Sequence, residues 1–298
     1  MNASVPHLVQ YQGSKRLLAP KILQFIPRHF HHFIEPFSGM AAMTIATAVQ
    51  NRAEHYYVND INAPLINLFK TVVEEPETLY LDYKKVWEEQ FDYAEGPEKH
   101  YYHIRDLFNS GNTCPSFMLY LLARCVKGAV RYSSDGNFNQ GMDRRRHGTK
   151  PETIRRNSLL ISKLLLNKST FSSLDYRESV EMADENDIVY MDPPYQGVSN
   201  TRDHRYYSGI EYDDFVSMLD GLNRKKINFI ISYDGTCGNT SYGKDLPSDL
   251  ECTKFMLVAG KSAQATLLGE TQITSEALYV SKGLSRLLED EPTEFFLY

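Results

Sequence analysis

The chain has 298 residues, of which 42% are hydrophobic, and a formal net charge of −6. This length and composition allow a sizeable core, built either as one large domain or as one domain with an insertion. No apolar run approaches the roughly eighteen residues of a membrane span, and the N-terminus lacks a basic region followed by an apolar one, so we expect a soluble, cytoplasmic protein.

Cysteines and charge narrow the function classes further. The four cysteines lie far apart without any Cys-x-x-Cys spacing, which predicts neither a zinc site nor a disulfide framework. Residues 124–168 hold eleven lysines and arginines against three acidic residues, a local charge of +8, so the rest of the chain carries −14. One basic stretch on an acidic body is typical of a directed contact with nucleic acid.

The N-terminal segment predicts a turn followed by a helix. Gly13-Ser14-Lys15 precedes an apolar helical pattern that runs to Ile26 and that Pro27 ends. Such a turn can present backbone amides and an ammonium group to an anion, although an ordinary helix start has the same pattern. No upstream glycine stands at phosphate-loop spacing, which argues against a nucleotide triphosphatase.

The next stretch predicts the first βα unit of a doubly wound sheet. A strand from Phe33 turns through Gly39 into an alanine-rich helix that reaches Val49, and the glycine would let a ligand approach the backbone. Asp60 ends the following strand, twenty-one residues after Gly39, close to the spacing at which an acidic side chain meets ribose hydroxyls. Each piece alone also fits an ordinary αβ turn.

The middle of the chain predicts helices, a β-hairpin and a basic run. Ser134-Asp135-Gly136-Asn137, between aromatic residues, is a strong hairpin signal. Arg131 and Arg144–Arg146 flank it, and arginine serves both phosphates and guanine edges, so this hairpin is a candidate for entering a nucleic-acid groove. A solvated charged loop is the alternative. The expected helices cover 64–73, 79–91, 100–108 and 116–127, and Arg155, Arg156 and Lys163 are expected on a solvated helix face.

After residue 167 the α/β pattern resumes. A strand over 169–176 ends in Asp175, and a glycine-rich polar segment, 235–243, predicts a loop. The remaining expected elements are strands over 188–191, 227–233, 255–259 and 276–281 and a helix over 212–222.

The strand over 188–191 ends in the most informative pattern of the chain. Its apolar run stops at Asp192, Pro193, Pro194 and Tyr195, at the sheet edge where open α/β sheets bind ligands. The prolines remove N–H donors and leave rigid carbonyl acceptors. Asp192, the Pro193 carbonyl and the Tyr195 ring together match an exocyclic amino group on a flat base, whereas the plain alternative is a strand that ends in a Pro-Pro turn.

Four stretches, in this order, resemble the Dam-like N6-adenine DNA methyltransferases. The resemblance spans nearly the whole chain, and its most specific part, Asp192–Tyr195, is identical to the family's catalytic motif. The others are Tyr11-Gln-Gly-Ser-Lys15, Phe33 to Gly39, and Asn59-Asp60-x-Asn62.

This resemblance implies an α/β fold of the class I, Rossmann-like methyltransferase type. The catalytic domain would comprise residues 1–70 and 165–298, and a target-recognition insertion of helices and a hairpin would comprise 71–164. S-adenosylmethionine would be the cofactor and double-stranded DNA the partner. The implied cofactor residues are Tyr11, Gly13, Lys15, Glu35, Pro36, Phe37, Gly39, Asp60, Asp175, Tyr176 and Asp192. The implied catalytic residues are Asp192, Pro193, Pro194 and Tyr195, and the implied DNA-binding residues are Arg131, Asn139, Arg144, Arg145 and Arg146.

Two departures limit the transfer. Ala41 stands where the family has a second glycine, so the cofactor's approach there is expected to be tighter. Ser133 and the segment 140–143 depart from the usual Asn and Val-Pro-Phe-Gly, so the GATC target is not carried over. The expected reaction is methyl transfer to N6 of a flipped-out adenine, in a restriction-modification system with a cognate endonuclease or as an orphan or phage enzyme, with a monomer favoured. The alternatives are an N4-cytosine, RNA or protein-glutamine methyltransferase, and a DNA-binding regulator without turnover.

Overall fold

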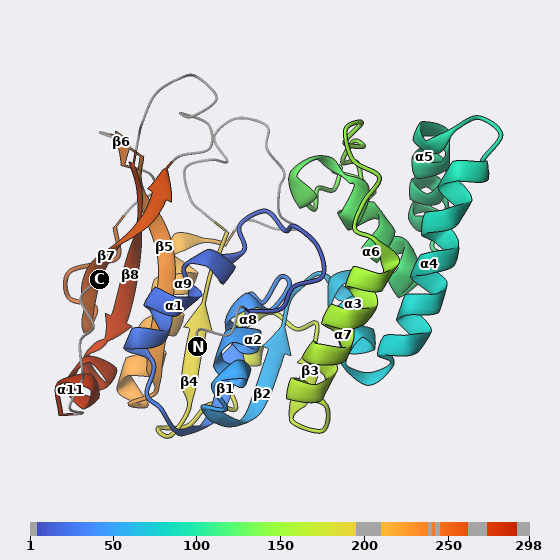
Figure 1. Ribbon diagram of the computed structural model, residues 1–298. Helices are drawn as coiled ribbons and strands as arrows, with labels where there is room; N and C mark the ends of the chain where they lie inside the picture. Colours follow the sequence, from blue (N-terminus) through green and yellow to red (C-terminus); the bar gives the residue numbers. More distant parts are fainter. Residues whose placement is uncertain (1–4, 195–209, 238–239, 242–244, 262–272, 291–298) are drawn as a thin grey trace.

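One mixed sheet runs through the molecule and carries helices on both faces (Figure 1). The computed structural model describes residues 5–194, 210–237, 240–241, 245–261 and 273–290. The strands in these residues are β1 (Phe30–Glu35), β2 (Ala53–Asn59), β3 (Ser169–Ser172), β4 (Ile188–Met191), β5 (Asn228–Cys237), β6 (Thr240–Ser241), β7 (Cys252–Lys261) and β8 (Ile273–Ser281). Their order in the sheet is β3-β2-β1-β4-β5-β8-β7, with β6 paired to β5.

The strand order reverses between β1 and β4. Strands β1 to β5 pair in parallel, and β8 runs antiparallel between β5 and β7. All four residues of β4 are buried, which explains its unbroken apolar sequence, because helices cover both faces of the sheet. The reversal creates a crevice at the carboxyl ends of β1 and β4. This architecture confirms the expected class I methyltransferase type of α/β fold.

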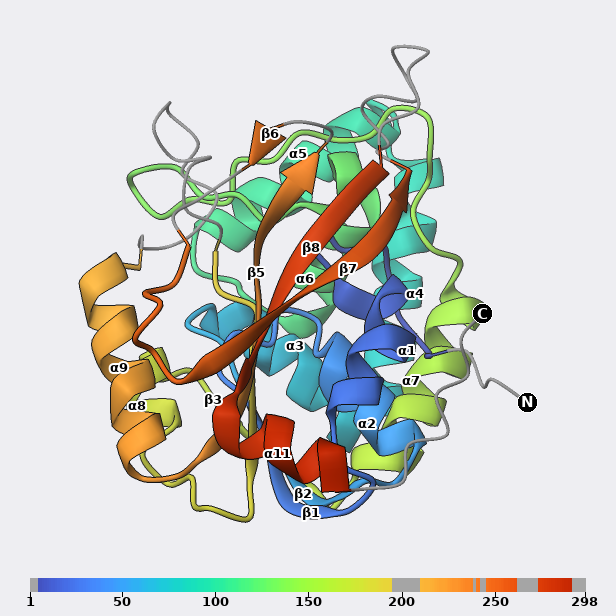
Figure 2. The same cartoon turned by 90° about the vertical axis from the view of Figure 1, so that its left-hand side faces the viewer.

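Helices form two layers, one on each face of the sheet. Figure 2 shows α8 (Tyr176–Ser179) and α9 (Tyr212–Arg224) on one side, and α1 (Ala19–Ile22), α2 (Ala42–Val49) and α7 (Pro151–Leu165) on the other. A separate buried cluster fills each layer, so each face of the sheet has its own hydrophobic core. None of the helices in the described residues is long and apolar enough to cross a membrane.

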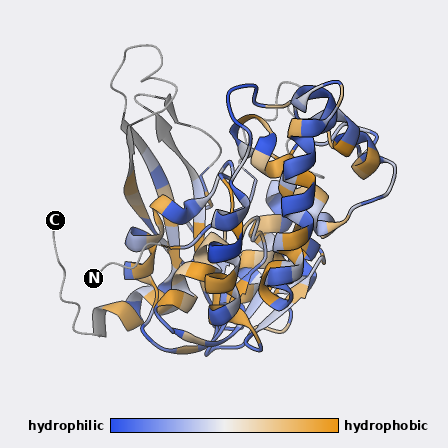
Figure 3. Cartoon of the chain, turned by 45° about the vertical axis from the view of Figure 1, so that its right-hand side comes forward, coloured by the Kyte–Doolittle hydropathy of each residue, from blue (hydrophilic) through white to orange (hydrophobic). Residues whose placement is uncertain are grey.

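The central helices extend the larger of these two cores. They are α3 (Ala63–Glu74), α4 (Pro76–Asp92), α5 (Pro97–Asn109) and α6 (Pro115–Arg124). Buried Tyr101 and Tyr120 of α5 and α6 belong to the same cluster as Phe33 of β1. Figure 3 shows hydrophobic and hydrophilic residues alternating along these helices, as expected when one side of a helix faces a core. The helical part therefore packs directly against the sheet layer.

The expected hairpin is present in a minimal form. Tyr132 and Phe138 form an isolated antiparallel bridge. Inside it, the backbone N–H of Gly136 donates to the Ser133 carbonyl at 3.0 Å, which closes the turn. Both bridging aromatic side chains are buried, so hydrophobic anchoring rather than a long ladder holds the hairpin on the body of the protein.

Four segments differ from the sequence expectation in their local structure, beyond shifts of up to three residues at the ends of other elements. The single helix expected before Pro27 is divided into η1 (Lys15–Leu17), α1 and η2 (Leu23–Phe25), while Ile26 is extended, as the residue before a proline should be. The helix expected over 116–127 ends at Arg124 because Cys125 takes an extended conformation, with φ −74° and ψ 160°, and Lys127, in η3 (Val126–Gly128), then takes a left-handed φ of 62°. The strand expected over 169–176 stops at Ser172, and Asp175 caps the N-terminus of α8.

The fourth difference concerns the loop expected over 235–243. Strand β5 continues to Cys237, and β6 pairs back onto it through Thr236 and Cys237. An irregularity in the β5–β8 register between Tyr233 and Thr236 accommodates the intervening residues, including Gly235. Residues 238–239 and 242–243 of this segment lie outside the described residues.

Gly128 is the point at which the N-terminal segment meets the central helices. Its φ is +59°, and a Cβ atom there would lie 1.8 Å from the carbonyl oxygen of Gln10. The Gly128 carbonyl accepts a hydrogen bond from the Gln12 N–H at 3.0 Å. Only a residue without a side chain allows these two backbones to approach so closely.

We predict that Gly128→Ala destabilises the fold, because the added methyl would collide with the Gln10 carbonyl in a backbone conformation that itself costs about 1–3 kcal/mol for alanine. Gly141→Ala is the matched control, since nothing lies within 4 Å of a Cβ atom at that position. Urea unfolding followed by circular dichroism should show a lower midpoint for Gly128→Ala only. Equal midpoints for the two variants would contradict this account of the turn.

Candidate active site

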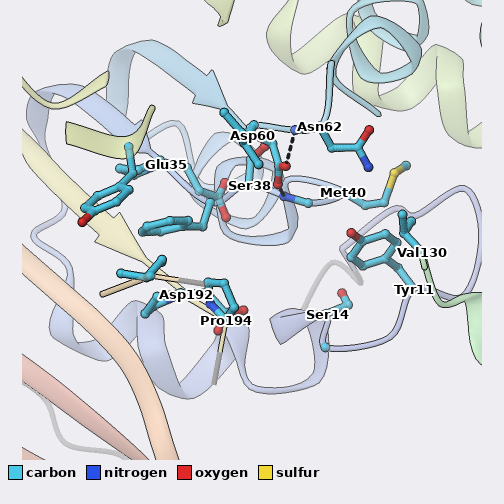
Figure 4. A pocket seen from close by; sticks show the side chains of 18 of the residues that line it. Tyr11, Ser14, Glu35, Ser38, Met40, Asp60, Asn62, Val130, Asp192 and Pro194 are labelled. Carbon is cyan, nitrogen blue, oxygen red and sulfur yellow. Dashed lines mark hydrogen bonds between the residues drawn. The ribbon is translucent and has the colours of Figure 1, made fainter. Parts of the chain in front are cut away.

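A cavity of about 620 Å³ opens at the carboxyl ends of β1, β2 and β4 (Figure 4). The N-terminal turn, the loop after β1, the start of α8 and the hairpin supply its walls. It brings together residues from seven separate stretches of the chain, three of which, after β1, β2 and β4, meet because they follow the carboxyl ends of parallel strands. The expected site residues that line it are Tyr11, Gly13, Lys15, Glu35, Pro36, Phe37, Gly39, Asp60, Arg131, Asp175, Tyr176, Asp192, Pro193 and Pro194.

Lys15 and Asp192 form an ion pair at the floor of the site. The Lys15 Nζ donates to Asp192 Oδ1 at 2.7 Å and also lies 3.2 Å from Glu276 Oε1. Lys15 is almost fully buried, and Asp192 is about one-fifth exposed, so the carboxylate remains accessible from the cavity. Burial raises the pKa of Asp192, while the neighbouring Lys15 ammonium opposes that rise.

Asp60 ties the end of β2 to the loop after β1. Its Oδ2 accepts from the Gly39 N–H and its Oδ1 accepts from the Asn62 N–H, both at 2.9 Å (Figure 4). Burial raises the pKa of Asp60, although these two backbone donors favour the carboxylate. A carboxylate has about four lone-pair directions, so the two bonds leave acceptor capacity for a ligand hydroxyl.

Asn59 joins three neighbouring segments just below the cavity. Its side-chain amide donates to the carbonyls of Pro36 at 3.1 Å and Leu174 at 3.0 Å, and its Oδ1 accepts from Ser172 Oγ at 2.8 Å. These bonds fix the loops after β1 and β3 relative to the end of β2. The walls of the cavity are therefore held by a side chain that is itself buried.

Glu35 is buried behind the site, at the end of β1. Its Oε2 accepts from both the hydroxyl and the backbone N–H of Thr44, at 2.5 and 3.0 Å, near the start of α2. Burial raises the pKa of Glu35 to about 8, the Thr44 hydrogen bonds lower it, and the Asp192 charge adds to the rise. The carboxyl group thus anchors the first turn of α2 to the strand that carries the cavity's rear wall.

The far wall is aromatic. The rings of Phe37 and Tyr176 lie 5.2 Å apart, and Phe215 of α9 packs against both. Asp175 pairs with Arg177 at 2.8 Å, which lowers the pKa of Asp175. This wall offers flat apolar surface for a planar ring, with polar groups only at its edge.

The loop after β1 brings its backbone close to Tyr11. Gly39 has a φ of +50°, and a Cβ atom there would lie 2.9 Å from Tyr11 Cε1. Ala41 also takes a left-handed conformation, with φ 52° and ψ 43°, and its methyl group is fully buried. The alanine therefore retains the left-handed backbone that a glycine adopts easily, and its side chain points into the core.

The hairpin contributes Arg131 to the same cavity. Next to it, Tyr132 OH donates to Asn62 Oδ1 at 3.1 Å, and Asn62 also caps the N-terminus of α3. Asn139 is exposed, and its backbone N–H donates to the Arg131 carbonyl at 2.9 Å. The base of the hairpin is thus connected through Asn62 to the Asp60 side of the site.

The three consecutive arginines have different environments. Arg146 donates to buried Asp143 through Nη2 at 2.8 Å and to Gln10 through Nη1 at 2.8 Å. Arg145 is 86% exposed and Arg144 is 77% exposed, with Arg144 paired to Glu98. The Arg145 backbone N–H and the two arginine side chains lower the pKa of Asp143. Arg146 therefore fixes the loop, whereas its two neighbours present their charge to solvent.

One expected catalytic residue, Tyr195, lies outside the described residues. Sequence reasoning missed several contributors, among them Gly128, Arg177 and Glu276. Glu276 had a recognisable signal, because it is an acidic residue directly before the apolar run 277–280 of a buried strand. Gly128 and Arg177 had no recognisable sequence signal. The contacts of Gly128 are with the distant N-terminal segment, and the pairing of Arg177 depends on the start of α8 at Asp175.

Comparison with known proteins agrees with this geometry. Residues 11–264 match the family model described as D12 class N6 adenine-specific DNA methyltransferase. The chain is 28% identical to the type II methyltransferase M1.LlaDCHI of Lactococcus lactis subsp. cremoris over 222 residues. This aligned region covers 71% of this chain and 74% of that protein.

Two further relatives carry similar names. The retron Ec67 DNA adenine methylase of Escherichia coli is 28% identical over 70% of this chain and 67% of its own length. The DNA adenine methylase of Haemophilus influenzae is 28% identical over 68% of each chain. Because the family model covers most of the sequence, including the whole cavity, this chain belongs to the D12 class N6 adenine-specific DNA methyltransferases.

Proposed function

We propose that this methyltransferase binds S-adenosylmethionine in the 620 Å³ cavity and methylates N6 of an adenine rotated out of duplex DNA. The observation that supports this most strongly is the position of Asp192. Its carboxylate stands at the end of β4, exposed to the cavity and followed by two prolines that also line it. A carboxylate and a proline carbonyl that line the same cavity suit an extruded amino group, because both accept hydrogen bonds.

The residues of the cavity fit the cofactor's chemistry. The Phe37 and Tyr176 rings form an apolar wall suited to adenine, and Asp60 retains acceptor capacity for ribose hydroxyls. Asp192 supplies negative charge that complements a sulfonium cation. Gly39 removes a side chain where the backbone must stay close to Tyr11 and to a ligand. When bound, the cofactor supplies an electrophilic methyl group.

The chain's own residues would align the amino nitrogen for transfer. Asp192 and the Pro193 carbonyl accept the two amino hydrogens, which directs the nitrogen lone pair toward the methyl group, and Tyr195 stacks on the base. With the bound cofactor as methyl donor and its neutral thioether as leaving group, positive charge would build on the amino nitrogen. The Asp192 carboxylate stabilises that charge and is the nearest acceptor for the proton that N6 then loses. The raised pKa of Asp192 favours this acceptance.

The basic hairpin would supply the DNA contacts. Arg131 lies at the cavity, where a side chain reaches the base pairs next to an extruded nucleotide, and Asn139 stands beside it. Arg144 and Arg145 present exposed charge suited to phosphates. Extruding a base costs a few kcal/mol, and phosphate contacts by residues 71–164 would offset that cost.

The relatives' names support two proposals for the biological setting. A type II methyltransferase among them supports a restriction-modification role with a cognate endonuclease, and the retron relative equally supports an orphan or mobile-element enzyme. We propose a cytoplasmic monomer that acts on double-stranded DNA in either setting.

The first prediction tests the catalytic carboxylate. Asp192→Asn should lower methyl transfer at least about a hundredfold, as loss of one transition-state hydrogen-bond group typically does, because an amide cannot stabilise charge on the nitrogen. The variant should remain folded, because the new amide oxygen can still accept a hydrogen bond from Lys15 Nζ and Glu276 remains 3.2 Å from that ammonium group. Asp213→Asn, the same chemical change at an exposed residue of α9, should retain full activity. Radiolabelled methyl incorporation into DNA measures both, and near-normal turnover by Asp192→Asn would refute this role.

The second prediction separates base reading from phosphate binding. Arg131→Ala should relax the methylated motif at one base pair, with a loss of about 1–3 kcal/mol of discrimination. The pair Arg144→Ala and Arg145→Ala should weaken binding to every sequence alike and reduce the salt slope by roughly one unit per lost contact. Sequencing of methylated adenines and DNA titrations at two salt concentrations give the two readouts.

Arg146→Ala serves as the structural comparison for these variants. It leaves buried Asp143 without its main partner, so a fall in thermal stability is expected together with any loss of binding. If the methylated motif changed in the Arg144→Ala, Arg145→Ala variant and stayed the same in Arg131→Ala, the assignment of base reading to Arg131 and phosphate binding to the other two would be wrong.

A further inference from the structure

Glu276 is a second carboxylate beside the ammonium group of Lys15. It comes from β8, the antiparallel strand of the sheet, and its Oε1 lies 3.2 Å from Lys15 Nζ. Asp192 Oδ1 lies 2.7 Å from the same nitrogen. The side chains of Lys15 and Glu276 are only 5% and 13% exposed, so solvent screens this cluster weakly.

The cluster contains more negative than positive charge. One ammonium group compensates one of the two carboxylates, which leaves a net charge of −1 when both are ionised. Burial raises the pKa of Glu276, Lys15 lowers it, and the Asp192 charge raises it further. Among the residues that the structure describes, the other titratable groups whose charges act on the cluster are Tyr190 and Glu35, both buried, and neither adds a positive charge.

We propose that Glu276 is a positioning residue that acts through Lys15 and gives the site its preference for the sulfonium cofactor over the uncharged product. Because Glu276 shares the Lys15 ammonium group, the negative charge of Asp192 is only partly compensated. The Asp192 side of the site therefore stays negative, where the cationic sulfur would lie. After transfer, the sulfur of S-adenosylhomocysteine is neutral and this attraction disappears, which favours product release. The inference rests on the proposed function, because it assumes that this cavity binds the cofactor.

A purely structural role makes a different prediction. If Glu276 only satisfied the buried ammonium group, its removal would weaken S-adenosylmethionine and S-adenosylhomocysteine binding equally, because the two molecules share every group except the methyl and its charge. The ratio of the two affinities therefore isolates the electrostatic contribution from any general damage to the cavity.

The experiment measures both affinities by titration calorimetry on the full chain. Glu276→Gln keeps the size of the side chain and removes its charge, and we expect it to reduce the preference for S-adenosylmethionine about tenfold, the effect of one charge at a nearby, partly screened site. Glu276→Asp should retain the preference. Asp245→Asn is the matched control, because it removes the same charge from a carboxylate bonded to Lys254 and to Tyr279, another β8 residue.

A second pair of variants keeps the test independent of how well Glu276→Gln folds. Lys15→Met and the double variant Lys15→Met, Glu276→Gln differ only by the Glu276 charge, and the double variant buries one charge fewer. The preference for S-adenosylmethionine should be higher in the single variant. An unchanged affinity ratio in Glu276→Gln, or equal ratios in this pair, would overturn the role of Glu276. Failure of the unmodified protein to bind either molecule would instead overturn the proposed cofactor site.

Discussion

The ion pair between Lys15 and Asp192 is the interaction on which the site depends. It joins a turn near the N-terminus to the end of β4 across 177 residues of sequence, with a separation of 2.7 Å. An almost fully buried ammonium group is costly without a partner, so the pair holds the N-terminal segment against the sheet edge. The same contact fixes the Asp192 side chain where it lines the cavity, with about one-fifth of it exposed.

Two close backbone approaches make that ion pair geometrically feasible. Gly128 allows the segment around Gln10 to pass against the turn after α6, and Gly39 allows the Tyr11 ring to rest on the loop after β1. Asp60 then binds that loop through the Gly39 N–H. Together these short-range contacts hold the N-terminal turn, which has little regular secondary structure, in a fixed position beside β4.

Much of this arrangement was predictable from local sequence patterns. The Asp192 strand, the Gly39 loop and the Asp60 strand end each have a clear local pattern, and their carboxyl ends meet because parallel strands share an edge. Asp175 was expected at the end of the strand that begins at Ser169, but it is the N-cap of α8. A carboxylate that ends a strand and one that caps the next helix have the same sequence pattern. Glu276 could not be paired with Lys15, since their contact depends on an antiparallel strand that enters the sheet beside β5. The different environments of Arg144–Arg146 were likewise not predictable, because the pairing of Arg146 depends on the buried position of Asp143.

The central claim is that this cavity methylates the amino group of adenine in duplex DNA. The most direct measurement is mass-spectrometric analysis of nucleosides from unmethylated duplex DNA after incubation with the purified protein and S-adenosylmethionine. The account predicts N6-methyladenine as the methylated nucleoside, confined to one short sequence motif when the same DNA is sequenced. N4-methylcytosine as the product, or DNA without any methylated nucleoside while the cofactor is bound, would contradict it.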